Sequence, residues 1–182
     1  MNLSREALIL FLTLAGVSAS AADWPAPVPP MIPGAFGYVP IPNAAVAPDA
    51  SRVYKVIYDT TRVGSKPDQP VDGILLAATN MSALRGQGVA AANTRFALIF
   101  HGRAIDGILD NAHYKAKFGM DNPNLAMLAE LKKAGAELFV CGQMLIATKT
   151  DPATLSPDVT VASEAFIVLI TYQNDGYAVL QF

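Results

Sequence analysis

The chain contains one cysteine, Cys141, and two histidines, His101 and His113. Cys141 follows "ELFV", which is apolar after Glu137, and His101 follows the apolar run "FALIF". The next residue is a glycine in both cases, Gly142 or Gly102, which lets a ligand or another backbone come close. The thiolate is the nucleophilic form of cysteine, and a neighbouring histidine is a common base for producing it. We therefore predict Cys141 and His101 as catalytic residues.

Other roles for these side chains stay open at this point. A free cysteine is often a small buried hydrophobic residue, so Cys141 can equally belong to the core. A disulfide between two chains is a third role, which burial at a strand end would disfavour. His101 can instead end its strand with a hydrogen bond to the backbone. We expect His113, within "DNAHYKAKFG", on a solvated helix face.

The segments that must position these residues alternate between strand-like and helix-like patterns. Apolar runs, several of them rich in β-branched residues, predict strands at 53–59, 94–102, 136–142, 155–163 and 177–182. Patterns of helical spacing fall between them, at 71–88, 104–119, 122–135, 143–149 and 163–176. Strands that alternate with helices favour a parallel sheet covered on both faces. The predicted fold class is α/β, a three-layer α/β/α sandwich.

Ligands of an open parallel sheet bind at the carboxyl ends of its strands, where both His101 and Cys141 fall. The predicted helix at 143–149 begins directly after Cys141, and free amides at a helix start favour a thiolate. We assign weaker binding roles to the residues that flank the pair, namely Gly102, Gly142 and Gln143.

Two helix ends carry capping signals. Asn122 is expected to cap one helix, with Pro123 in its first position. Ser163 is expected to cap the last helix, which Gly176 would end.

The first residues have the layout of a secretory signal peptide. Arg5 precedes an apolar stretch at 7–17, and small residues follow it up to Ala22. The stretch is about half of the ~20 residues that a membrane-spanning helix needs. We predict a signal peptide at residues 1–21 and a periplasmic or secreted protein with no remaining membrane anchor.

Residues 22–50 are predicted to form an extended arm. The part from Trp24 to Asp49 holds eight of the chain's 13 prolines, which exclude a regular helix or a central strand. Its apolar side chains, Ile32 among them, exceed what a purely solvated linker carries. Packing on its own domain or on a neighbouring subunit therefore stays open beside disorder. Residues 51–182 would form the α/β domain.

Charge and motifs exclude several classes of function. The chain has 13 Lys and Arg against 15 Asp and Glu, scattered along its length, so no basic face for nucleic acid is predicted. No glycine-rich nucleotide loop and no recognised spacing of metal ligands are found. We therefore predict no cofactor and no metal.

From about Val53 to Phe182 the chain resembles the DsrE/DsrF-like family, which includes the sulfur-relay proteins DsrE and TusD and the YchN-like proteins. The resemblance rests on the strand ending in "FHG", the unit "LAELKKAGAELFVCGQMLI" and the late helix leading into "QNDGYAVLQF". It implies a five-stranded parallel sheet in which the strands ending at His101 and Cys141 are neighbours. It also implies a homo-oligomer.

The resemblance implies a function as well. In the relay members, the cysteine that matches Cys141 carries sulfur as a persulfide and passes it to a partner protein, which requires only one thiol per chain. We predict an exported member that binds or relays sulfane sulfur on Cys141, with a sulfur donor or acceptor protein as its partner. The alternative is a non-catalytic oligomeric binding or assembly module in which Cys141 is a buried structural residue. Whether the protein turns over a substrate as an enzyme stays open.

Overall fold

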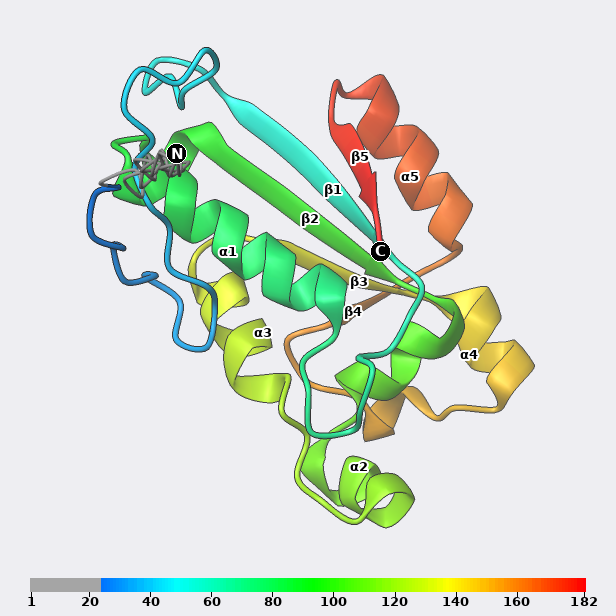
Figure 1. Cartoon of the computed structure of the whole chain (residues 1–182). Helices are drawn as coiled ribbons and strands as arrows, with labels where there is room; N and C mark the ends of the chain where they lie inside the picture. Colours follow the sequence, from blue (N-terminus) through cyan, green and yellow to red (C-terminus); the bar gives the residue numbers. More distant parts are fainter. Residues whose placement is uncertain (1–23) are drawn as a thin grey trace, which may run out of the picture.

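A computed structural model describes residues 24–182, which include the sheet that carries the candidate site. The predicted signal peptide lies outside the described part. Five strands pair in the order β4-β3-β2-β1-β5, and every pairing is parallel (Figure 1). Their bounds are β1 Tyr54–Thr60, β2 Thr94–Phe100, β3 Glu137–Cys141, β4 Thr160–Ala162 and β5 Ala178–Gln181. The predicted five-stranded parallel sheet is confirmed.

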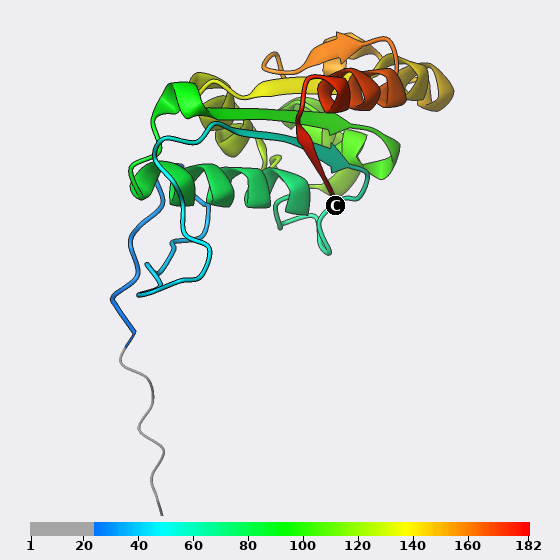
Figure 2. The same ribbon diagram turned by 90° about the horizontal axis from the view of Figure 1, so that it is seen from above.

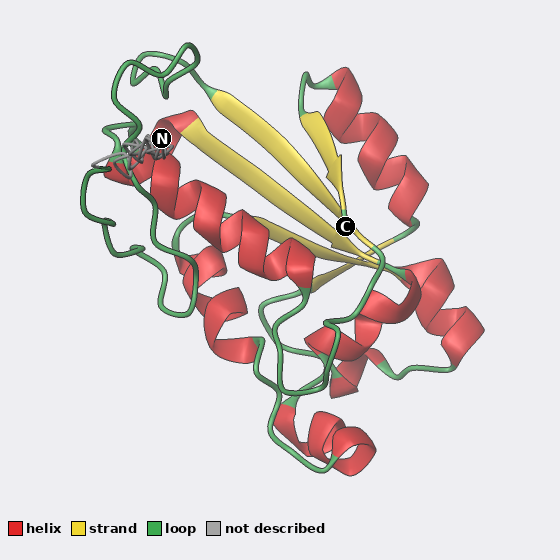
Figure 3. Cartoon of the chain, viewed as in Figure 1, coloured by secondary structure: helices red, strands yellow, loops and turns green. Residues whose placement is uncertain are grey.

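Helices cover both faces of this sheet (Figure 3). Figure 2 shows α1 and α5 on opposite sides of the strands. Strand side chains alternate between the two sides. Tyr58 and Leu98 belong to the larger core under α1 and α3, whereas Ile57 and Ile99 belong to the smaller core under α5. The helices are α1 Asp72–Gly86, α2 Asn111–Phe118, α3 Leu125–Lys133, α4 Gly142–Thr148 and α5 Ala165–Asn174. The predicted three-layer α/β/α fold is confirmed.

The central strand β2 is buried on both faces, as its apolar sequence predicts. All of its residues except Arg95 are buried, because helices lie on both sides of it. No helix in the described part of the chain is long and apolar enough to cross a membrane.

The single helix predicted at 104–119 is wrong. The chain forms a 3-10 segment at Gly102–Ile108 and then a separate helix, α2. Asp110 caps α2 by accepting a hydrogen bond from the amide of His113 at 2.8 Å. The side chain of His113 is exposed on α2, as predicted.

The cap predicted at Asn122 is wrong by two residues, because α3 begins at Leu125 with Asn124 in the capping position. The side-chain oxygen Oδ1 of Asn122 accepts a hydrogen bond from the backbone amide of Asn124 at 2.9 Å. Its side-chain amide donates to the carbonyls of Gly107 and Leu109. Asn122 therefore ties the 3-10 segment to the start of α3.

The described part of the proline-rich arm lies beside α1 (Figure 1). Val28 and Tyr38 form an antiparallel bridge that folds the arm back on itself. Ile32 lies between them in sequence and is buried in the larger core, and its amide donates to the Ser82 hydroxyl of α1 at 3.3 Å. The arm therefore packs on its own domain through Ile32.

Candidate functional site

Cys141 is the last residue of β3 and holds the N-cap position of α4, so the predicted helix after the cysteine is confirmed. Its side chain is 5% exposed and free, and it faces the smaller core under α5. The thiol therefore stands at the carboxyl edge of the sheet.

A second helix also reaches the thiol. The Sγ atom of Cys141 accepts a hydrogen bond from the amide of Ala165, the first residue of α5, at 3.3 Å. Amides at a helix start carry partial positive charge, so this contact stabilises negative charge on the sulfur. The cap predicted at Ser163 is wrong, because the chain stays extended through Glu164, whose side chain makes no capping hydrogen bond.

His101 stands beside Cys141 on the neighbouring strand. Phe100 pairs with Val140 in the parallel register, and His101 and Cys141 are the next residues on their strands. The predicted neighbourhood of the two strands is confirmed. No hydrogen bond within residues 24–182 joins the imidazole to the sulfur.

The imidazole of His101 is instead bonded to a carboxylate that sequence reasoning did not assign to the site. Its Nε2 atom lies 2.6 Å from Oδ1 of Asp59 on β1. The other oxygen, Oδ2, accepts a hydrogen bond from the side-chain amide of Gln181 on β5 at 3.1 Å. The sequence also allowed His101 to form a hydrogen bond to the backbone at its strand end. The ring nitrogen Nε2 bonds to Asp59 instead.

A cavity of about 290 Å³ brings three of the predicted site residues together. Most of its lining side chains are apolar, and Glu164 is the acidic residue among them. The lining residues are His101, Cys141, Gln143, Met144, Ala147, Glu164, Ala165 and Phe166.

Gly102 and Gly142 lie outside this cavity and line neighbouring hollows. A Cβ atom on Gly142 would lie 2.8 Å from the carbonyl oxygen of Ala162, and one on Gly102 would lie 3.0 Å from that of Thr61. Gly102 also has a positive φ of 59°, which favours glycine. Both glycines admit a neighbouring backbone, and their predicted role in ligand binding stays a prediction.

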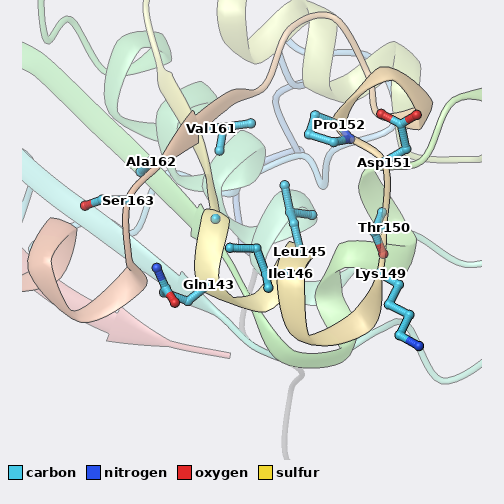
Figure 4. A pocket seen from close by; sticks show the side chains of 11 residues that line it. Gln143, Leu145, Ile146, Lys149, Thr150, Asp151, Pro152, Val161, Ala162 and Ser163 are labelled. Carbon is cyan, nitrogen blue, oxygen red and sulfur yellow. The ribbon is translucent and has the colours of Figure 1, made fainter.

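A larger hollow of about 630 Å³ lies between α4 and the edge strand β4 (Figure 4). Leu145 and Val161 project into it, whereas the side chain of Lys149 points away. Gln143 lines both this hollow and the cavity at Cys141, so the two spaces meet at one side chain.

No group of three or more His, Cys, Asp or Glu residues lies close enough to hold a metal ion within residues 24–182.

Comparison with known proteins places this chain in a family. The model of the DsrE/DsrF-like family matches residues 73–182. The chain belongs to the DsrE/DsrF-like family. The match begins inside α1, so it includes Cys141 and His101 but leaves β1, with Asp59, outside.

One solved structure similar to this DsrE/DsrF-like chain is the protein of unknown function MTH1491 from Methanobacterium thermoautotrophicum. The TM-score is 0.52 at 17% sequence identity, over 71% of this chain and 99% of that chain. Identity at this level shows a shared fold alone. The comparison with curated proteins gives no match.

Proposed function

We propose that this DsrE/DsrF-like chain is an exported protein that binds or relays sulfane sulfur as a persulfide on Cys141. The observation that carries the proposal is the position of the sulfur. Sγ accepts a hydrogen bond from the first amide of α5 and borders a cavity that also contains His101. The proposed export rests on the signal-like first residues of the sequence.

The reaction needs one thiolate and a donor that already carries sulfane sulfur. The Cys141 thiolate attacks the outer sulfur of a donor persulfide, R–S–SH. A bond forms between Sγ and that sulfur, the sulfur–sulfur bond of the donor breaks, and its electron pair leaves on R–S⁻. The leaving thiolate takes up the proton that Cys141 gave away, so there is no net oxidation or reduction. The same exchange in reverse delivers the sulfur to an acceptor thiol.

The surroundings of Cys141 suit this chemistry in two ways. The Ala165 amide stabilises a negative charge on Sγ before the attack and on the persulfide after it. The apolar side chains of Met144, Ala147 and Phe166 limit the access of water and of unrelated thiols to the bound sulfur.

Mass spectrometry of the peptide that contains Cys141 tests the proposal after incubation of the protein with polysulfide. We expect the wild-type peptide to gain the mass of one sulfur atom, and a reducing dithiol to remove it. Cys141→Ser should show no gain, whereas His113→Gln, on the exposed face of α2, should behave as the wild type. A wild-type protein that gains no sulfur, or an equal gain in Cys141→Ser, would contradict the proposal.

A second candidate function, an oligomeric assembly module, is favoured by the surface of α5. This helix carries no charged side chain over its ten residues. Phe166, Ile167 and Ile170 are 61%, 51% and 52% exposed along it. A helix that is apolar all round is usually buried, so a second copy of this chain is the proposed cover for this face. In that case Cys141 is a core residue.

A further inference from the structure

The face of the sheet beneath α5 changes from apolar to polar at its carboxyl edge. Ile57, Ile99, Phe139 and Val179, one from each of four strands, contribute to the smaller core. Side chains two positions further along a strand point to the same face. On these four strands, the residues at that position are Asp59, His101, Cys141 and Gln181.

The order of the strands places these four residues next to one another on one face, with His101 and Cys141 two register positions beyond Asp59 and Gln181. Reading across β3, β2, β1 and β5 gives Cys141, His101, Asp59 and Gln181. Hydrogen bonds join the last three, because one oxygen of Asp59 is bonded to His101 and the other to Gln181. Asp59 is only 6% exposed, so its carboxylate is buried with both oxygens occupied.

We propose that Asp59 is a positioning residue for the sulfur chemistry and acts on Cys141 through His101. This inference rests on the proposed function of Cys141. A carboxylate only accepts hydrogen bonds, so Nε2 of His101 must carry a hydrogen. In the neutral imidazole the unprotonated nitrogen is then Nδ1.

The proton step follows from that assignment. When Cys141 becomes the nucleophile, its proton moves to Nδ1 of His101 and the electron pair of the S–H bond stays on Sγ. The imidazolium that forms keeps its Nε2–H bond to Asp59, whose negative charge stabilises it. Gln181 holds the second carboxylate oxygen and so prevents Asp59 from turning away from His101.

The chain offers an internal control in its other aspartate–histidine pair. Nδ1 of His113 lies 2.7 Å from Oδ1 of Asp110 at the exposed start of α2. The residue types and the distance are similar, but the bonded nitrogen differs, and neither residue lines the cavity at Cys141. A contact to Nδ1 predicts the opposite tautomer for His113.

Nitrogen NMR of the histidine-labelled full chain measures the two tautomers directly. We expect His101 with a protonated Nε2 and a free Nδ1, and His113 with a protonated Nδ1. His101→Gln removes one set of signals and thereby assigns both. A protonated Nδ1 on neutral His101 would overturn the inference.

The rate at which Cys141 reacts with iodoacetamide tests the effect on the thiol without any sulfur donor. We expect Asp59→Asn to lower this rate by about 10²-fold, the lower end of what a positioned base contributes. His101→Gln should lower it as far, and the double variant should be no slower than either single one, because both act along one path. Asp110→Asn should react as the wild type does.

Equal rates for Asp59→Asn and the wild type, or losses that add in the double variant, would overturn the inference. If Asp59→Asn does not fold, the inference is still tested by the tautomer of His101 in the wild type and by the rate at which His101→Gln reacts with iodoacetamide. The alkylation rate could depend on Asp59 although the protein takes up no sulfur. That pair of results would refute the proposed function and leave the positioning role of Asp59 intact.

Discussion

The hydroxyl of Tyr58 is buried on β1 and accepts a hydrogen bond from Asn80 at 2.9 Å. Burial raises the pKa of Tyr58 from 10.0 to about 12, because desolvation disfavours the anion. The stability that the neutral Tyr58 hydroxyl gives the folded state is fully present below the unfolded pKa of about 10. It is lost as the pH rises through about 12.

We therefore expect the free energy of unfolding to fall by roughly 2 kcal/mol between about pH 10 and about pH 12 on account of Tyr58. Urea unfolding at several alkaline pH values measures this fall in the free energy of unfolding. Tyr58→Phe should flatten the decline by that amount, whereas Tyr54→Phe on the same strand should not. An unchanged decline in Tyr58→Phe would show that this hydroxyl is not responsible.

At the level of single residues, the sequence predicts only part of the site. Cys141 and His101 stand out because each is a rare residue type that ends an apolar run. Asp59 and Gln181 also end strands, but a single polar residue there looks like ordinary surface until the order of the strands is known. The amide of Ala165 has no signal in the sequence, because any residue at that position provides one.

Among the elements, the arm makes the sharpest prediction. Ile32 is 1% exposed and belongs to the larger core, whereas its neighbour Met31 is 48% exposed. Ile32→Ala should lower the free energy of unfolding by about 2–4 kcal/mol, since it leaves a cavity between the arm and α1. Met31→Ala should change it by less than about 0.5 kcal/mol. Chemical denaturation measures the free energy of unfolding of both variants. If Ile32→Ala lost no more of it than Met31→Ala, the packing of the arm would add nothing to stability.

Element boundaries show where local patterns stop being sufficient. The strands were predictable because their runs are apolar and short. The break between the 3-10 segment and α2 was not, because it depends on a bridge between Leu109 and Leu155 and a hydrogen bond from the amide of Asp110 to the carbonyl of Thr154. Contacts over such separations do not appear in the helical spacing of residues 104–119.

For the whole molecule, the exposed face of α5 predicts self-association. Ile170→Asp should shift the molar mass measured by light scattering to a smaller species, because a charge at an apolar interface is costly to bury. Lys132→Asp, at an exposed position of α3 on the other face of the sheet, should leave the mass unchanged. A wild-type protein that is monomeric at every concentration would refute the assembly proposal without affecting the chemistry of Cys141.

The bonds of Asp59 also set an order in which the sheet can assemble and fray. Its partners lie 42 and 122 residues away along the chain, and closing the longer loop costs more entropy. The pairing of β1 with β2 can therefore join Asp59 to His101 before β5 brings Gln181 to the free edge. Loosening of that edge would release the carboxylate from Gln181 while Cys141, on the far side of β1 and β2, keeps its place.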